Sequence, residues 1–336
     1  MKPAFHWCPL KPPTAKLRVG TYFANSLAFA GGLLGLLMVV FGLDAGLPLY
    51  LPMLASVLLF GLPHGAIDHL VILGLAKSSL SLKALALVCL IYLSFVVVML
   101  CLWWGAPLVA VILFLAITIY HWGRADLAFE GLLNPEALQA TPRILKFNHS
   151  FLRGILPIGI PFLSFPDATE AILNSCSIAF GYKYELGATL PFVILIFLLL
   201  LLFSEIAFLR YQGVQRTVRL VEDLGLIAFF VLVPPLLAVG LYFCLWHGFR
   251  HVLRLIRYEG NQGDCETSLA RFKQFYSQAL PFTLASILIL AIVLLLLRGS
   301  VDLSVFTGIY LVVISSLTVP HLLVVEWMDR VEFRCR

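Results

Sequence analysis

Charged residues are scarce in this sequence. They make up 12% of the 336 residues, whereas apolar residues make up 61%. A soluble globular domain has about 25% charged and about 45–50% apolar residues, so this composition excludes a soluble domain and indicates a membrane protein. The net charge of +5 is small, and basic loop residues that orient a membrane protein account for it. We therefore expect no nucleic acid among its partners.

The sequence also lacks closely spaced cysteine pairs and adjacent histidines. Its seven cysteines are scattered, and no Cys-x-x-Cys pair occurs, which excludes a zinc ribbon and a dithiol redox site. We expect the cysteines to act as small apolar residues within helices. No His-His dipeptide occurs either.

Long apolar runs are abundant. A helix that spans a bilayer needs about 20 predominantly apolar residues, and such runs fill the chain from about residue 23 to 328. They lie at about 23–43, 49–76, 83–104, 107–127, 148–166, 187–209, 223–257, 279–298 and 303–327. The predicted fold is an all-α, polytopic helical bundle of about eight to ten membrane segments. It forms one transmembrane domain, 23–328, between a basic tail, 1–22, and a short tail, 329–336.

The distribution of basic residues predicts the orientation in the membrane. The positive-inside rule places the basic tail 1–22 in the cytoplasm. The run 223–257 is too long for one span, and Pro234-Pro235 should break it because proline has no backbone donor. A short first half and a full span at 236–257 put both termini in the cytoplasm. The alternative, in which 148–166 does not cross the membrane, leaves the basic loop 210–219 outside and is less favoured.

Four short histidine motifs lie within these apolar runs and hold six of the eight histidines. They are PHGAIDH (Pro63–His69), HWGRAD (His121–Asp126), WHGFRH (Trp246–His251) and PH (Pro320–His321). Hydrocarbon is a poor solvent for imidazole, so such side chains need one another, water or a metal as partners. The motifs therefore predict a metal site between transmembrane helices.

The spacing of the histidines identifies candidate ligands. His247 and His251 are four residues apart, which places both rings on one face of a helix. Together with His64 and His121 they are the predicted metal ligands. His69 and His321 are either further ligands or residues that support the site. For His6 and His149, a hydrogen bond between helices or an interface position is sufficient.

Two aspartates accompany the histidines. Asp68 and Asp126 either accept a hydrogen bond from a metal-bound histidine, which would fix the ring tautomer, or pair with arginines such as Arg124, Arg250 and Arg254, because buried charges need partners. Arg250 itself lies between two candidate ligands. A ligand set dominated by imidazole suits iron(II), zinc or copper and does not suit calcium or magnesium.

At these motifs the chain resembles the Brp/Blh family of membrane-bound β-carotene dioxygenases. The family's PHG-x-x-D, H-[WF]-G, WH-x-x-R-H and PH patterns occur here in order, from Pro63 to His321. The resemblance implies an iron(II) enzyme of a bacterial or archaeal cell membrane that splits the central 15,15′ double bond of β-carotene with O₂ into two molecules of retinal. It assigns the iron to His64, His121, His247 and His251, and makes a microbial rhodopsin the recipient of retinal.

Other functions agree with parts of the pattern. A membrane di-iron hydroxylase or desaturase also carries many helix histidines, but usually in His-x-x-His-His clusters. A metal or proton transporter could use intramembrane histidines along a pathway, and two of the histidines could ligate haem. A transporter would need a path to both faces of the membrane, whereas all four motifs are expected in the cytoplasmic half of the bilayer.

Overall fold

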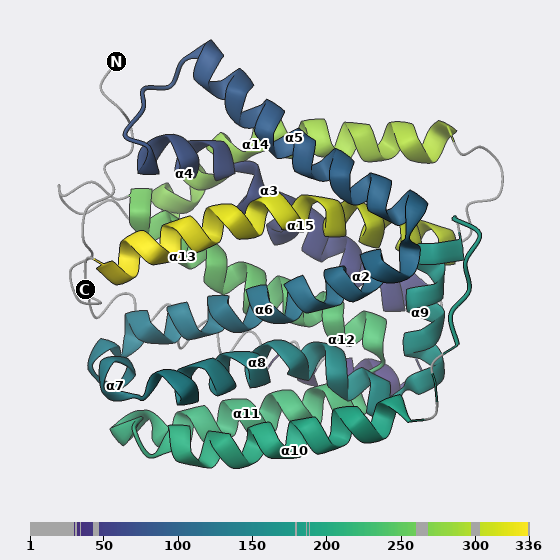
Figure 1. Ribbon diagram of the computed structural model, residues 1–336, viewed down its shortest axis with the longest axis vertical. Helices are drawn as coiled ribbons and strands as arrows, with labels where there is room; N and C mark the ends of the chain where they lie inside the picture. Colours follow the sequence, from purple (N-terminus) through teal and green to yellow (C-terminus); the bar gives the residue numbers. More distant parts are fainter. Residues whose placement is uncertain are drawn as a thin grey trace.

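The computed structural model describes residues 30–42 without 31 and 34, then 47–178, 180–185, 187, 189–259, 268–296 and 303–334. Within these ranges every regular element is a helix, and most helices run side by side along one direction (Figure 1). The predicted all-α fold is confirmed. The α-helices are α2 (Leu47–Ser56), α3 (Leu62–Ala66), α4 (Asp68–Leu75), α5 (Leu82–Gly105), α6 (Pro107–Leu133), α7 (Pro135–Ala140), α8 (Arg143–Ser164), α9 (Pro166–Ile178), α10 (Leu190–Leu209), α11 (Arg216–Leu232), α12 (Pro235–Tyr242), α13 (Phe249–Glu259), α14 (Ser268–Leu296) and α15 (Leu303–Arg334).

Seven helical stretches in the described part of the chain are long and apolar enough to cross a membrane, so this is a multi-pass membrane protein. They are Met53–Leu75, Leu82–Gly105, Pro107–Leu133, Leu190–Leu209, Pro235–Ile256, Leu269–Ile292 and Ser304–Glu332. The predicted run 148–166 forms most of α8, which is not among the seven. Basic residues in its first half lower its hydropathy, and α8 packs against α6 and α10 inside the bundle.

Proline divides the long run 223–257 where the sequence predicts it. α11 ends at Leu232, and Val233 adopts an extended conformation before Pro234. Pro235 then starts α12, which continues through a π-helical segment, η3 (Phe243–Gly248), into α13. The candidate membrane span Pro235–Ile256 therefore begins as a helix separate from α11, as the missing proline donors require.

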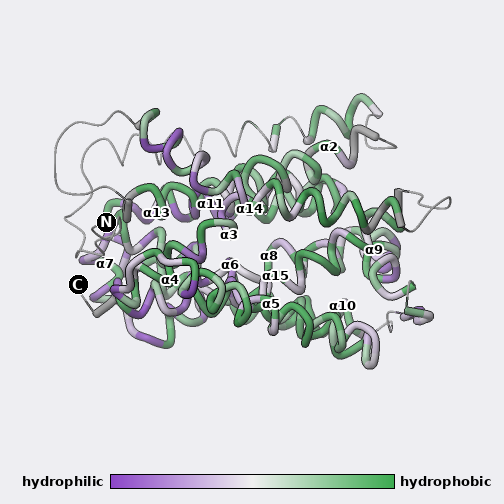
Figure 2. Tube along the Cα trace, turned by 90° about the horizontal axis from the view of Figure 1, so that it is seen from above, coloured by the Kyte–Doolittle hydropathy of each residue, from purple (hydrophilic) through white to green (hydrophobic). Residues whose placement is uncertain are grey.

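The last helix continues past residue 328, where the sequence analysis places the end of the transmembrane domain, because α15 ends at Arg334. Asp329 and Glu332 are buried there, and both carboxylates pair with Arg254 of α13. These ion pairs bind the end of α15 to the bundle. Figure 2 shows that hydrophilic residues gather at this end of the molecule, near α7 and α13.

Two glycines allow α6 and α8 to approach closely. A Cβ atom on Gly123 would lie 1.8 Å from the Ser150 carbonyl oxygen, and one on Gly154 would lie 1.8 Å from the Ile119 carbonyl oxygen. Only glycine permits backbones to meet at such distances. Gly123 belongs to the HWGRAD motif, so its position explains the glycine that follows the motif's histidine.

Candidate metal centre

The first ligand candidate, His64, is oriented by an irregular helical turn. A π-helical segment, η1 (Val57–Gly61), precedes α3, and Pro63 cannot donate the usual helical bond to Leu59. The Tyr276 hydroxyl donates to the Leu59 carbonyl instead, at 2.7 Å. The His64 Nδ1 lies 2.5 Å from the Phe60 carbonyl oxygen. Because a carbonyl can only accept, Nδ1 carries the proton and Nε2 keeps a free lone pair.

A second π-helical segment carries His247. The segment η3 ends at Gly248, where a Cβ atom would lie 2.8 Å from the Phe60 Cβ. This glycine therefore allows η3 to lie against η1. The rings of His247 and His251 are 6.3 Å apart and nearly parallel, at 10°. Single π-helical turns are often found at functional sites, and here one such turn precedes His64 and another contains His247.

Five buried imidazole rings meet at the centre of the bundle; we call them the histidine cluster. They come from α3, α6, η3, α13 and α15 and belong to His64, His121, His247, His251 and His321. The shortest distances between ring centroids are 4.8 Å for His64 and His321 and 5.0 Å for His121 and His247. Ligating nitrogens of His64, His121 and His247 all lie within 4.8 Å of one another, so these three residues could hold a metal ion.

Several buried ring nitrogens of the cluster have no hydrogen-bond partner among the described residues, and each neutral imidazole has one unprotonated nitrogen that could bind a metal. Both ring nitrogens of His121, Nε2 of His247, Nδ1 of His251 and Nε2 of His321 are buried without a hydrogen-bond partner among the described residues. A buried polar atom without a partner destabilises a protein by about 1–3 kcal/mol. Neutral imidazoles that face one another relieve this penalty by binding a metal, and their nitrogen donors suit iron, copper or zinc.

An apolar cavity opens next to the cluster. Its volume is about 1340 Å³, with the open space at its mouth included, and three cluster residues, His64, His121 and His321, lie on its surface. The remaining walls are mainly aliphatic and aromatic side chains of α5, α6, α8, α9, α12 and α15. A cavity of this kind suits a large apolar ligand that is placed by shape. A metal held by the cluster would face that ligand.

Comparison with known proteins identifies the family. Residues 55–329 match the family model described as beta-carotene 15,15'-dioxygenase. The chain belongs to this family. The probable beta-carotene 15,15'-dioxygenase Blh of Halobacterium salinarum is 34% identical over 299 residues, 84% of this chain and 85% of that protein. A beta-carotene 15,15'-dioxygenase of an uncultured marine bacterium, 66A03, is 27% identical over 205 residues, 59% of this chain and 66% of that protein. No solved structure gives a significant match.

In this member of the β-carotene dioxygenase family, the residues that were predicted to support the metal site differ in whether they contact the histidine cluster. Asp68 contacts a cluster histidine, since its Oδ2 lies 2.8 Å from Nδ1 of His321. His69 lies away from the cluster: its Nδ1 donates to the Ala66 carbonyl at 2.9 Å, and its ring packs on Phe282. Of the two residues that the sequence left open as ligands or supports, the fold brings only His321 into the cluster.

Asp126 takes the ion-pair role. It accepts hydrogen bonds from Arg250 at 2.8 Å and from the Trp246 indole at 3.0 Å. In the described structure it contacts none of the cluster histidines, and the ion pair with Arg250 is one of the two roles that the sequence left open for it. The Arg250 guanidinium also stacks on the Trp246 ring, 3.6 Å from its centroid. Asp126 thus binds both Trp246 and Arg250, which directly precede His247 and His251 in the chain.

These residues are part of a larger buried charge network that the sequence analysis did not predict. Its centre is Arg153 of α8, which pairs with Glu222 at 2.9 Å and with Asp223 at 3.1 Å. His149 lies between two carboxylates, 2.8 Å from Glu205 and 3.0 Å from Glu130. The position of His149 agrees with a hydrogen bond between helices. The feature of the sequence that could have indicated this network is a charged residue inside an otherwise apolar run, such as Glu205.

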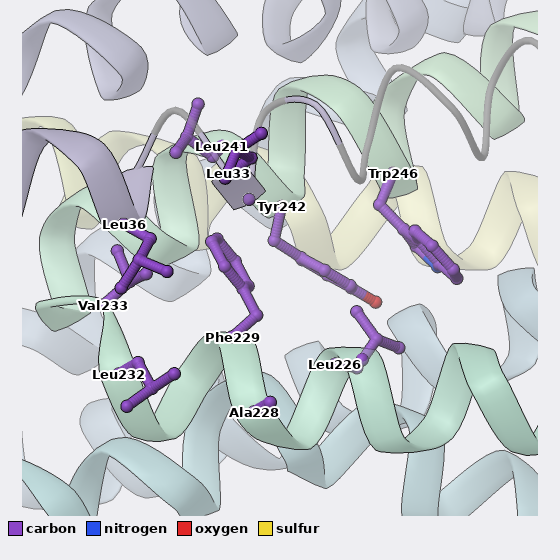
Figure 3. A pocket seen from close by; sticks show the side chains of 12 residues that line it. Leu33, Leu36, Leu226, Ala228, Phe229, Leu232, Val233, Leu241, Tyr242 and Trp246 are labelled. Carbon is purple, nitrogen blue, oxygen red and sulfur yellow. The ribbon is translucent and has the colours of Figure 1, made fainter.

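A second, smaller cavity lies on the opposite face of α12. The space between its walls is about 750 Å³, and it is bounded by α11 and by residues near Leu33. Figure 3 shows Tyr242 projecting toward Leu226, with Phe229 on one side of it and Trp246 on the other. None of the cluster histidines is among its described lining residues. The larger cavity is therefore the one that joins the candidate metal centre.

Proposed function

We propose that this protein cleaves the central 15,15′ double bond of β-carotene with O₂ and yields two molecules of all-trans-retinal. Iron(II) is the proposed cofactor, held by His64, His121, His247 and His251. Each product aldehyde takes one oxygen atom from O₂, so the reaction needs no external reductant. Family membership supports the reaction, since the matched family model and both relatives carry this activity in their names.

One observation carries the proposal: buried, unpartnered imidazole nitrogens lie beside a large apolar cavity. β-Carotene is a hydrocarbon without polar groups, so an enzyme must place it by length and width alone. Aliphatic and aromatic walls meet that requirement. Bound iron(II) supplies activation of O₂, while the surrounding side chains exclude water from the reacting double bond.

The location of the substrate agrees with a membrane enzyme. β-Carotene dissolves in the bilayer, and seven helices among the described residues are long and apolar enough to cross one. We infer a bacterial or archaeal cell membrane as the site of action, with both termini in the cytoplasm. Retinal leaves into the same bilayer, where a microbial rhodopsin is the natural recipient of this chromophore.

Expression in bacteria that produce β-carotene tests the reaction. Extracts analysed by chromatography should lose β-carotene and gain retinal. His247→Ala should abolish this conversion, because it removes a ligand. His69→Ala is the matched control, since it removes a histidine outside the cluster, and it should retain conversion. Retention of β-carotene by well-inserted, iron-loaded wild-type protein would overturn the proposal.

A further inference from the structure

His321 has the surroundings of a metal ligand. Its ring centroid lies 4.8 Å from that of His64, 5.1 Å from that of His121 and 5.4 Å from that of His251. The side chain is 5% exposed. It therefore lies within the cluster and on the wall of the larger cavity.

The hydrogen bond to Asp68 determines which nitrogen of His321 is free. Nδ1 lies 2.8 Å from the Asp68 Oδ2. An ionised carboxylate only accepts, so Nδ1 carries the proton and the Nε2 lone pair is available. Nε2 is buried and has no hydrogen-bond partner within the described structure. A carboxylate bound to the far nitrogen of an imidazole is the usual arrangement behind a metal-bound histidine.

Tyr92 holds that carboxylate in place. Its hydroxyl lies 3.2 Å from the Asp68 Oδ2 and 3.3 Å from the carbonyl oxygen of Leu317, one helical turn before His321. The hydroxyl thus connects three helices: α5, which carries Tyr92, α4, which carries Asp68, and α15. Tyr92 also lines the larger cavity. Its geometry fixes the carboxylate relative to the helix that presents the imidazole.

A purely structural role for His321 disagrees with the rest of the molecule. His149 shows how this chain accommodates a structural buried histidine: both of its ring nitrogens meet carboxylates, at 2.8 and 3.0 Å. Among the described residues His321 has a partner on one nitrogen only, and the other nitrogen faces the imidazoles of the cluster. His149 thus makes a fully hydrogen-bonded contact between helices, whereas His321 keeps one nitrogen that could bind a cation.

We propose that His321 is a fifth nitrogen ligand of the metal in the histidine cluster, and that Asp68 and Tyr92 are its positioning residues. This inference rests on the proposed function for the presence of a metal. The ligand is a transition-metal cation that accepts neutral nitrogen donors. The wall of the cavity is then formed partly by the metal's own ligands, with Tyr92 beside them.

Cobalt(II) is a suitable probe, because its visible absorption changes with the number and type of its ligands. The full chain would be purified in detergent, freed of metal with a chelator and titrated with cobalt(II) against a competing dye. His321→Ala should weaken binding and change the spectrum, and added imidazole should restore the wild-type spectrum. Asp68→Asn should weaken binding about 10–100-fold, and Tyr92→Phe should weaken it less, because the carboxylate remains.

Two control variants separate this effect from general damage. Tyr310→Phe makes the same change as Tyr92→Phe within the same cavity, and His69→Ala removes a neighbouring histidine; both should leave cobalt affinity and spectrum unchanged. His321→Gln preserves most of the side-chain volume if the alanine variant does not fold. Unchanged cobalt affinity and spectrum in the His321 variants, or no cobalt binding by the wild-type chain, would overturn the inference. A spectral change without retinal formation would instead reject the proposed function alone.

Discussion

Hydrogen bonding divides the buried histidines into two kinds. His149 has both nitrogens occupied by carboxylates, whereas neither nitrogen of His121 has a partner in the described part of the chain. The motif aspartates also differ in their partners, because Asp68 binds a cluster histidine, His321, whereas Asp126 binds Arg250. The roles of individual residues thus follow from their partners more than from their motif.

The role of Asp126 predicts a loss of stability in Asp126→Asn. Removal of its charge weakens the compensation of the buried Arg250, and breaking a buried pair destabilises a protein by about 3–5 kcal/mol. Cobalt affinity of the folded fraction should stay near the wild-type value, since Asp126 contacts no cluster histidine in the described structure. Thermal unfolding in detergent and the cobalt titration measure the two quantities. A large loss of cobalt affinity with normal thermal stability would instead indicate that Asp126 supports a metal ligand directly.

The sequence left the roles of Asp68 and Asp126 open for a physical reason. Asp68 and His321 are 253 residues apart in the chain, and Asp126 and Arg250 are 124 residues apart. Spacing along a helix identifies neighbours three or four residues apart, as it does for His247 and His251, but it does not say which helices lie side by side. Tyr92 lies outside the four histidine motifs, and the sequence therefore did not identify it as part of the site.

At the scale of helices, close approach and irregular turns bring the cluster together. The two π-helical segments adjoin or contain cluster residues, and Gly248 allows them to touch. Apolar runs predict most helices well, because length and hydropathy decide a span. They do not reveal a π-helical turn, since one inserted residue leaves the hydrophobic composition unchanged. The break at Pro234-Pro235 was predictable because proline acts locally.

The contact between α6 and α8 predicts that Gly123→Ala damages the protein. The new methyl group would overlap the Ser150 carbonyl, and backbone cannot move aside as a flexible side chain can. Overpacking destabilises a core by about 1–3 kcal/mol or more, so we expect a lower unfolding temperature and poorer recovery of monodisperse protein. Gly105→Ala is the matched control, because a Cβ atom there meets nothing within 4 Å. Equal stability of the two variants would contradict this packing.

At the scale of the whole molecule, one bundle combines a charged end, a histidine cluster and an apolar cavity. The apolar composition and the order of the motifs predict the bundle and the family. Which residues pair in the charge network around Arg153 was not predictable, because the partners of Arg153 come from α6 and α11. Each of those charges alone resembles an ordinary loop or interface residue, and only the packed bundle shows that they neutralise one another.

The cavity predicts where a bulky side chain will interfere with β-carotene. Leu115→Trp places an indole on the wall of the larger cavity, whereas Leu36→Trp places one in the smaller cavity. Overpacking of about 1–3 kcal/mol corresponds to a loss of about 5–150-fold in affinity. We expect the first variant to raise the KM for β-carotene and the second to leave it near the wild-type value. The reverse result, measured by retinal formation in detergent, would assign the substrate to the smaller cavity.

We propose that iron at the histidine cluster cleaves β-carotene. The most direct test is to titrate metal-free, purified protein with iron(II) and to measure retinal formed from β-carotene with and without O₂. Activity should rise to a maximum at about one iron per chain, be absent with zinc and require O₂. Full activity in metal-free protein would contradict the account, and a maximum at two irons per chain would point to a di-iron enzyme instead.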